Sequence, residues 1–382
     1  MIKINEKYKC SGCHACSAIC PKDCITMQVD EEGFKYPKVD AELCINCGLC
    51  EKVCPILHHT FKNDAPIAYA AVNFNDQVRE LSSSGGVFYL IAKYVIENGG
   101  VVFGAKFDDD FNVVHSYAQT MEEIESFMGS KYAQSIIGEN YTYAKKFLDS
   151  GKLVLFTGTP CQIGGLKAFL NKGYENLICQ DLICHGVPSP KVWQRYMRFQ
   201  EKNKKSKICG VSFRNKTYGW KTFSMMLDFL NGDKVVERFA TDLYMTSFLR
   251  DLCLRPSCYK CSFKGKSRDA DITLADFWGV QNVMPEMDDD KGTSLVIVHS
   301  PKGQQIFETI KENLRFQTVD FELATKNNPM MMQSASDKKE RKRFLIDIEK
   351  KPFDKVVNKY CTLKVKLIIR VKGKIKRVLK VT

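Results

Sequence analysis

Two rows of cysteines stand near the start of the 382-residue chain. In each row the cysteines are separated by two, two and three residues, and a proline follows the last one. The rows are Cys10, Cys13, Cys16 and Cys20, and then Cys44, Cys47, Cys50 and Cys54. In proteins with two such rows, three thiolates of a row bind one iron–sulfur cubane and the fourth ligates the other cluster. The spacing therefore predicts two 4Fe-4S clusters, one on Cys10, Cys13, Cys16 and Cys54, the other on Cys44, Cys47, Cys50 and Cys20.

Zinc is the main alternative for clustered cysteines. Zinc ribbons use separated Cys-x2-Cys pairs, and a repeated x2, x2, x3 row ending in Cys-Pro does not resemble them. Thiolates are also the soft ligands that iron–sulfur clusters select. A ninth cysteine of this region, Cys24, belongs to neither row, and we expect it to be a buried free thiol.

The composition is that of an ordinary globular protein, with 44% hydrophobic residues and enough length for two or three domains. No stretch approaches 18 consecutive apolar residues, and the first residues lack an apolar segment with a cleavage site. These features predict a cytoplasmic protein. In that reducing compartment the 17 cysteines favour metal binding over disulfides.

After about residue 65 the pattern alternates between strands and helices. Strands are expected at 67–74, 101–107, 113–118, 153–156, 177–183, 208–213, 223–229, 272–275 and 295–299, and helices at 87–97, after 160 to about 170, at 190–203 and at 304–313. Such alternation indicates a layered α/β body. We therefore expect an α+β ferredoxin-like head (residues 1–62) fused to an α/β layered body. The body divides into regions 63–180 and 181–330, and a basic extension covers 331–382.

Six short motifs of the body resemble a known family. They are Ser82-Ser83-Ser84-Gly85-Gly86-Val87-Phe88, Gly129-Ser130-Lys131-Tyr132, Thr157-Gly158-Thr159-Pro160-Cys161-Gln162, Asp181-Leu182-Ile183-Cys184-His185-Gly186, Pro256-Ser257-Cys258-Tyr259-Lys260-Cys261 and Asp276-Phe277-Trp278-Gly279. In series they are similar to the coenzyme F-420 hydrogenase/dehydrogenase beta subunit family, and more closely to its bacterial branch with a fused ferredoxin head. The resemblance covers roughly residues 1 to 330.

The resemblance implies an iron–sulfur flavoprotein oxidoreductase, because the family's beta subunits carry a flavin and a 4Fe-4S cluster. It does not imply that this chain uses the deazaflavin coenzyme. The bacterial branch occurs among polysaccharide-synthesis proteins whose substrates are largely undefined. The expected partners are a ferredoxin-like electron donor or a partner redox subunit, and an unknown small-molecule acceptor. The alternative hypothesis is that the chain is an electron-relay subunit without a substrate site of its own.

The flavin site has no Gly-x-Gly-x-x-Gly fingerprint to mark it. Residues 82–86 open a helix, where free N–H groups and serine hydroxyls can hold a phosphate, although an ordinary N-cap explains the same residues. The resemblance favours a flavin, FAD before FMN. We expect it near Ser82, Ser83, Ser84, Gly85, Gly86, Lys131, Thr157, Gly158, Thr159 and Pro160. No catalytic residue is assigned.

A third 4Fe-4S cluster is predicted in the body. Cys258 and Cys261 form a Cys-x2-Cys pair, while Cys161 and Cys184 each follow a predicted strand. In a parallel sheet both strand ends lie at the same carboxyl edge, and the family's body cluster takes cysteines from these three motifs. The competing set adds Cys253 to the pair with plant-type ferredoxin spacing. We discount it because Cys253 falls at the end of a helix expected from about residue 242.

The charge of +13 is concentrated at the end of the chain, where residues 362–382 hold eight Lys or Arg and no acid. Their apolar residues follow a helical period, which is typical of a basic amphipathic helix on a membrane surface or an acidic partner. A disordered or strand-like tail is the alternative, since Gly373 interrupts the pattern. The tail predicts peripheral contact with the inner face of the membrane. No nucleic-acid module is visible, so we expect no nucleic-acid partner.

Overall fold

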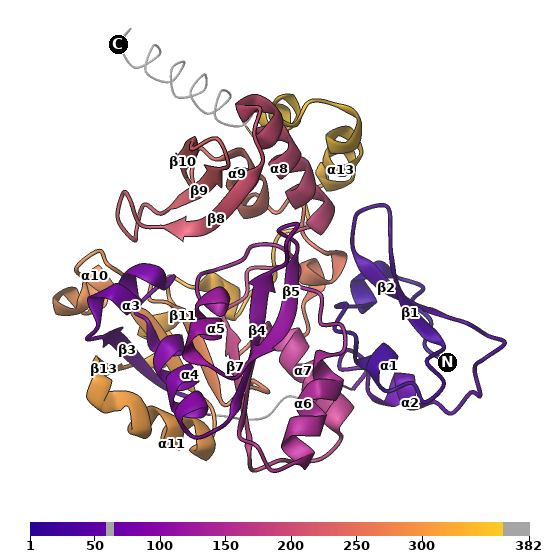
Figure 1. The fold of residues 1–382 in the computed structure, drawn as a ribbon, viewed down its shortest axis with the longest axis horizontal. Coiled ribbons are helices and arrows are strands. Elements are labelled where there is room, and N and C mark those ends of the chain that lie inside the picture. Colours follow the sequence, from indigo (N-terminus) through magenta and orange to yellow (C-terminus); the bar gives the residue numbers. More distant parts are fainter. Residues whose placement is uncertain (59–64, 362–382) are drawn as a thin grey trace, which may run out of the picture.

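The structure is a computed structural model that describes residues 1–58 and 65–361. The basic segment 362–382, with its predicted amphipathic helix, lies outside the described residues. Figure 1 shows three parts: a small head at one side, a body built on a large sheet, and a lobe above that sheet. Among the described residues, no helix combines the length and apolar character needed to cross a membrane.

The head is built from very short elements. Strands β1 (Ile25–Val29) and β2 (Lys35–Val39) form an antiparallel hairpin, with Ile25 opposite Val39. The remaining elements are the 3-10 turn η1 (Lys7–Lys9) and helices α1 (Ala15–Ala18) and α2 (Leu49–Lys52), and each of the two helices carries one cysteine of a predicted row. The buried core of the head contains Ile2 and Ile25 together with Cys16, Cys24, Cys50 and Cys54. Cysteines therefore take the place of much of a normal apolar core.

The body is organised around one mixed, eight-stranded sheet with the order β13-β3-β12-β11-β7-β6-β4-β5. The strands are β3 (Ile67–Asn73), β4 (Val101–Phe107), β5 (Val113–Ala118), β6 (Val154–Thr157), β7 (Leu177–Leu182), β11 (Ile272–Asp276), β12 (Ser294–Val298) and β13 (Leu314–Val319). The central strands β4, β6, β7 and β11 run parallel, and the outer strands pair antiparallel. The sequences of these central strands are nearly continuous apolar runs, because helices cover both faces of the sheet.

Two helical layers cover this sheet. Helices α4 (Val87–Glu97) and α11 (Pro301–Ile310) pack on one face. Helices α6 (Asn140–Asp149) and α7 (Pro160–Leu170) pack on the other. Shorter helices are α3 (Asp76–Leu81), α5 (Met121–Ile124), α10 (Val280–Val283) and α12 (Phe321–Thr325). The layered α/β body that the sequence predicts is therefore confirmed.

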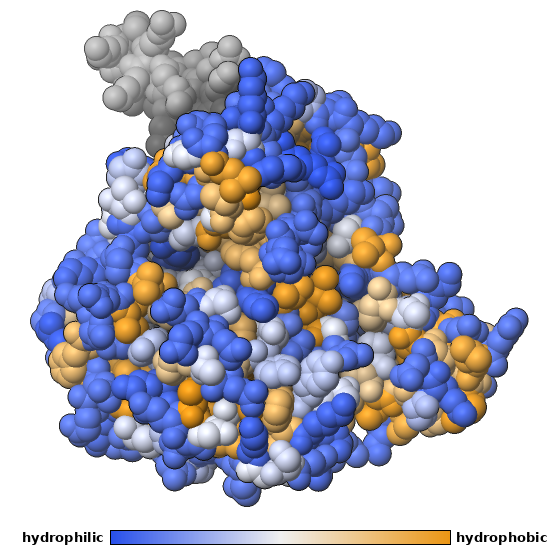
Figure 2. All heavy atoms as spheres, in the orientation of Figure 1, coloured by the Kyte–Doolittle hydropathy of each residue, from blue (hydrophilic) through white to orange (hydrophobic). Residues whose placement is uncertain are grey.

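The lobe consists of an antiparallel sheet with helices packed against it. Its strands are β8 (Ile208–Asn215), β9 (Ser224–Phe229) and β10 (Lys234–Arg238), and its helices are α8 (Pro190–Lys204), α9 (Leu243–Leu249) and α13 (Arg341–Lys350). Figure 2 shows apolar side chains gathered along the junction between this lobe and the large sheet.

The structure departs from the sequence-based expectations in a few elements. The predicted boundary between residues 180 and 181 lies inside β7, and strands from both sides of it build the same sheet. The helix expected over residues 242–252 ends at Leu249. Its end is set by Asp251, whose φ of 60° is left-handed and cannot continue a right-handed helix. Cys253 consequently lies beyond the helix.

Candidate redox centres

The first predicted set of head cysteines gathers where the head meets α7. Burial raises the pKa of Cys13 to about 12, and the nearby thiols of Cys10 and Cys54 add to the rise. Burial also raises the pKa of Cys16, and the nearby thiols of Cys13, Cys10 and Cys54 raise it further. These mutual effects indicate that Cys54, which belongs to the second row in sequence, lies near the cysteines of the first row.

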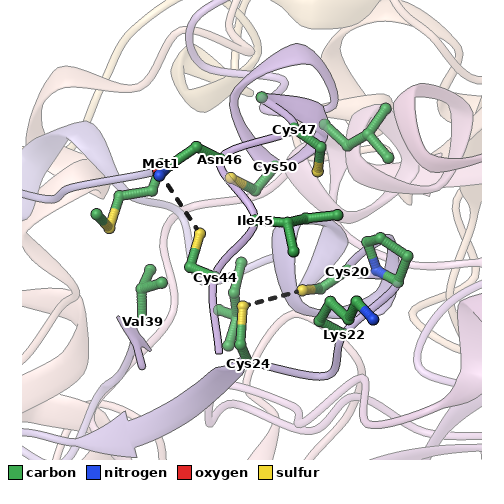
Figure 3. Close-up of a pocket in the computed structure, with 14 residues that line it drawn as sticks. Met1, Cys20, Lys22, Cys24, Val39, Cys44, Ile45, Asn46, Cys47 and Cys50 are labelled. Atoms are coloured by element: carbon green, nitrogen blue, oxygen red, sulfur yellow. Dashed lines mark hydrogen bonds between the residues drawn. The ribbon is translucent and has the colours of Figure 1, made fainter. Parts of the chain in front are cut away.

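The second set lines a hollow at the opposite end of the head. Its walls are formed by Cys20, Cys44, Cys47 and Cys50, and they enclose about 350 Å³ of space that is partly open to solvent. Figure 3 shows these cysteines around the hollow. Cys47 is exposed to solvent, so this set is the more accessible of the two. Cys24 also lines the hollow, and its sulfur lies 3.3 Å from that of Cys20.

In the body, the four predicted ligands come together from three separate segments. Cys161, Cys184, Cys258 and Cys261 line one cavity with about 520 Å³ of space, some of it open to solvent. Cys161 lies in the first turn of α7, directly after β6, and Cys184 follows β7, which is the parallel neighbour of β6. The 3-10 turn η3 (Pro256–Lys260) brings Cys258, and Cys261 follows it.

The donor set of this cavity fits an iron–sulfur cluster. Burial is the main reason why the pKa of Cys161 lies well above its ordinary value. The nearby thiols of Cys261, Cys184 and Cys258 raise it further. Among the described residues, no three His, Cys, Asp or Glu side chains converge in the way that ligands of a single metal ion do. A cubane instead takes one thiolate at each of four irons. Lys264, whose Nζ donates to the Cys184 carbonyl at 2.5 Å, brings positive charge to the cavity that four thiolates would require.

The competing plant-type set is not brought together. Cys253 is fully buried in the core of the lobe, where its sulfur lies 3.9 Å from the Ser247 hydroxyl. It is not among the residues that line the cysteine cavity. Cys179 and Cys361 are also buried, and Cys209 is exposed on β8.

The cavity adjoins the first head set through helix α7. Ser11 and Ile56 of the head help to line it. A Cβ atom at Gly165 would lie 3.1 Å from the sulfur of Cys13, so only glycine lets the head approach this closely. Cys161 precedes Gly165 by four residues on the same helix, which places the two positions one turn apart, about 5–6 Å between neighbouring side chains. Cys161, a predicted ligand of the body cavity, and Gly165, which contacts the head ligand Cys13, thus lie on successive turns of α7.

One short segment links the cysteine centres to the predicted flavin loop. The hydroxyl of Ser130 lies 2.8 Å from that of Ser83. Four residues later, the side-chain amide of Gln134 donates to the Ser11 carbonyl at 3.0 Å, and its backbone N–H donates to Pro188 at 3.1 Å. Four residues span at most about 14 Å of chain. Three segments therefore lie within a short distance of one another: residues 82–86 (the serine loop), the first cysteine row of the head and the loop after Cys184.

The predicted flavin loop, residues 82–86, connects α3 to α4. The hydroxyl of Ser82 donates to Val78, and that of Ser84 donates to Thr293. The Gly85 N–H donates to the Ser294 hydroxyl. Helix α4 begins after Gly86 without a side-chain cap, so its first N–H groups have no capping partner from that residue and suit an anion.

The other predicted flavin residues, Thr157 to Pro160, have a different setting. The Thr157 carbonyl pairs with His115 Nε2 at 3.0 Å, and Thr159 forms a capping box with Gln162. Pro160 lines the cysteine cavity. The hydrogen bonds of this segment fix the start of α7 beside that cavity.

Two family models match this chain. Residues 151–323 match the model for the C-terminal part of the beta subunit of coenzyme F420 hydrogenase/dehydrogenase, and residues 9–56 match that of a 4Fe-4S dicluster domain. The chain is therefore similar to the coenzyme F420 hydrogenase/dehydrogenase beta subunit family over residues 151–323, which is somewhat less than half of its length. It carries iron–sulfur clusters in its head and is related to electron-transfer oxidoreductases.

Individual relatives match this chain in part. It is 22% identical to a subunit of the F(420)H(2) dehydrogenase of Methanosarcina mazei, over 50% of this chain and 58% of that protein. It is 29% identical to a coenzyme F420-dependent sulfite reductase of Methanocaldococcus jannaschii, over 43% of this chain and 26% of the relative. The chain thus spans from about a quarter to somewhat over half of these relatives. A chain of the F420-reducing [NiFe] hydrogenase complex from Methanosarcina barkeri is 18% identical with a TM-score of 0.46, over 69% of this chain and 89% of that one.

Two basic residues near the serine loop were missed by the sequence reasoning. Arg214 on β8 forms a buried ion pair with Asp276 at 2.7 Å and donates to the Ser83 carbonyl at 3.3 Å. Lys216 donates to the carbonyls of Arg79, Ser84 and Lys291, and burial lowers its pKa to about 8. Both reach the loop from the lobe, and no local spacing in the sequence indicates that contact.

The predicted lysine of the flavin site lies close to the same loop. Lys131 follows Ser130, and its Nζ donates to the carbonyls of Met128 and Gly129 at 3.0 and 3.2 Å. Burial lowers its pKa to about 7. Lys131, Lys216 and Arg214 are thus three basic residues in or beside the segments that contact Ser83 and Ser84.

Proposed function

We propose that this chain is an iron–sulfur flavoprotein oxidoreductase. In this proposal it takes electrons from a ferredoxin-like donor and delivers them, through three 4Fe-4S clusters and a flavin, to a small-molecule acceptor. The observation that carries the proposal is the cavity lined by Cys161, Cys184, Cys258 and Cys261, because it also contacts the head through Ser11 and Ile56. A third cluster at this position would connect the head to the rest of the body.

Each residue set has a role in this proposal. The two head sets and the body set would each hold one cluster through four thiolates. The start of α4, Ser83 and Lys131 would hold a flavin phosphate, since they combine free N–H groups, a hydroxyl and a cation. When bound, clusters carry single electrons and a flavin converts between one-electron and two-electron transfer.

The accessible side of the head indicates where a donor would contact the chain. Cys47 is exposed, and the neighbouring Leu43 and Ile45 each expose 57% of their surface. In the first set Cys13, Cys16 and Cys54 are buried, and Cys13 lies against α7. The second set is therefore the entry point for electrons in this proposal, and the first set is the next position inward.

A relay protein without its own substrate site is the second candidate. It is favoured by one observation: a curated relative of this chain is itself one subunit of an F(420)H(2) dehydrogenase. The two candidates differ in what the purified chain does alone. An oxidoreductase reduces a small-molecule acceptor without further protein, whereas a relay protein does so only after a partner is added.

The proposal is tested on the full chain after anaerobic purification. Iron, sulfide and flavin are measured on the same sample, and we expect about twelve irons for three 4Fe-4S clusters together with one noncovalent flavin. A reduced ferredoxin should then bleach the flavin absorbance. Finding about eight irons and no flavin would restrict the cofactors to the head and overturn the proposal.

A further inference from the structure

Arg255 is a fully buried arginine that reaches from the body into the head. Its Nε donates to the Cys10 carbonyl at 2.8 Å, and its Nη2 donates to the Lys35 carbonyl at 2.9 Å. Its Nη1 donates to the side-chain oxygen of Gln134 at 3.0 Å. The remaining contact joins Nη2 to the sulfur of Cys10 at 3.5 Å. All these acceptors are neutral when Cys10 carries its proton.

The missing feature of this environment is a counter-charge. Among residues 1–58 and 65–361, no carboxylate oxygen lies within 4.0 Å of the Arg255 guanidinium. Burying a charge is costly unless it is paired. Among the hydrogen-bond acceptors of the guanidinium, the group that becomes anionic is the Cys10 sulfur, because the thiolate is the form that ligates metal. When Cys10 ligates the first cluster, its thiolate would supply the negative charge that pairs with the Arg255 guanidinium.

The backbone of Arg255 is fixed by the loops of the body cavity. Its N–H donates to the Val187 carbonyl at 3.0 Å, and its own carbonyl accepts from the Cys258 N–H at 2.9 Å. On the head side, a Cβ at Gly12 would lie 2.8 Å from Nη1, so this glycine between Cys10 and Cys13 leaves room for the guanidinium. Arg255 therefore stands between the first head set and the body set.

We propose that Arg255 raises the reduction potential of the first head cluster relative to that of the second, so that electrons pass inward. This inference deepens the proposed function and rests on the assignment of Cys10 to the first cluster. Hydrogen bonds to the sulfurs, net charge and burial tune iron–sulfur potentials. Reduction adds one negative charge to the cluster, which a buried cation stabilises. Bound to their thiolates, the two clusters would exchange one electron, lost by the second and gained by the first, and no bond or proton would change place.

Arg341 provides a matched control at the same interface. It is also a buried arginine that reaches the head, in this case from α13 of the lobe, but its Nη atoms contact the Glu32 carboxylate at 2.9 and 2.5 Å. Its other donors go to the Leu254 carbonyl and the Tyr259 hydroxyl. Arg341 is paired within the protein and contacts the hairpin instead of a cysteine ligand.

The test uses full chains with Arg255→Gln, Arg255→Lys or Arg341→Gln, prepared anaerobically. Iron content is measured first, and an EPR-monitored redox titration follows. In Arg255→Gln we expect one redox step to move to lower potential and the other steps to stay. The reduced-to-oxidised ratio of that step at a fixed potential should fall about tenfold, which is about 59 mV for a one-electron couple. Arg255→Lys should move the same step less, because it keeps the charge and loses the planar fork.

Three results would overturn the inference. The first is an Arg255→Gln chain with full iron whose steps all match those of the unchanged protein. The second is an equal shift in Arg341→Gln, which would assign the effect to docking of the head. The third is loss of four irons in both Arg255 variants but not in Arg341→Gln, which would make the role structural. An unchanged protein with fewer than eight irons would instead contradict the cluster assignment and the proposed function.

Discussion

The cysteines of the head and those of the body are organised in opposite ways. In the head, eight predicted ligands lie within 45 residues at regular spacing, and the regular elements around them are two four-residue helices, a 3-10 turn and a two-stranded hairpin. In the body, four ligands spread over 101 residues meet because β6, β7 and η3 end at the same place. The ligands of the head are thus close together in the sequence, with few regular elements around them, whereas those of the body are brought together by the tertiary structure.

This difference concerns stability as much as sequence. Domains of about 60 residues bury little surface and often need metals or disulfides. The head core is made largely of cysteines, so most of its stabilisation must come from the clusters. The body has apolar cores on both faces of its sheet and does not depend on a metal in this way.

Removing the clusters should therefore have the largest effect, and it should fall on the head. We expect amides of β1, β2, α1 and α2 to exchange with solvent freely in cluster-depleted protein, while those of β6 and β7 stay protected. Hydrogen-exchange mass spectrometry of the full chain before and after iron removal measures both. Equal protection of the head in the two samples would show that it has a self-sufficient core.

The proposed flavin site, like the body cavity, would be built from segments that are distant in sequence, and Lys131 tests this proposal. Replacing Lys131 with Met should weaken flavin binding about 10- to 100-fold, the equivalent of a charged hydrogen bond of about 1.5–3 kcal/mol. Ser82→Ala is the control, because that hydroxyl donates to the Val78 carbonyl. Unchanged retention in the Met variant would move the site elsewhere.

The same lysine predicts a pH dependence. Burial lowers its pKa to about 7 in the free protein, and an anionic ligand would raise it. Binding therefore takes up a proton between the two values, and affinity should fall as pH rises from about 7. The Lys131→Met variant should lose this slope in a flavin titration between about pH 6.5 and 8.5.

The close contact of α7 with the head can be tested at Gly165. A methyl group there would lie 2.9 Å from Cys13 Cβ and 2.8 Å from the Tyr141 hydroxyl, so Gly165→Ala forces a shift that costs about 1–3 kcal/mol. We expect a lower thermal midpoint and faster iron loss in air. Gly173→Ala is the control, since no atom lies within 4 Å of its Cβ position. Identical behaviour of the two variants would argue against tight docking at α7.

The smallest effect is expected at Cys24, which sharpens the meaning of the row pattern. Cys24 lines the second hollow as the predicted ligands do. Its position therefore does not exclude it as a ligand of the second cluster, and only the spacing of the rows does. Cys24→Ala should keep every iron and change the free energy of unfolding by at most about 1 kcal/mol. Loss of four irons would show that the rows were misassigned.

The sequence predicted those features that depend on near neighbours. The spacing of the head rows, the bounds of α4, β4 and β5, and the expectation that Cys161 and Cys184 follow strands all rest on local patterns. Strand β10, on the edge of the lobe, and β13, on the edge of the large sheet, were missed, because partly exposed edge strands carry weaker apolar patterns. Arg214, Lys216 and Arg255 were missed because each reaches its site from a distant segment.

The central claim is that the body cavity holds a third cluster on Cys161, Cys184, Cys258 and Cys261. The most direct measurement is the iron content of anaerobically prepared Cys161→Ser beside Cys253→Ser. We predict that Cys161→Ser falls from about twelve irons to about eight, while Cys253→Ser, altered in the core of the lobe, keeps about twelve. Retention of about twelve irons by Cys161→Ser together with a loss of four by Cys253→Ser would contradict the claim and favour the plant-type set.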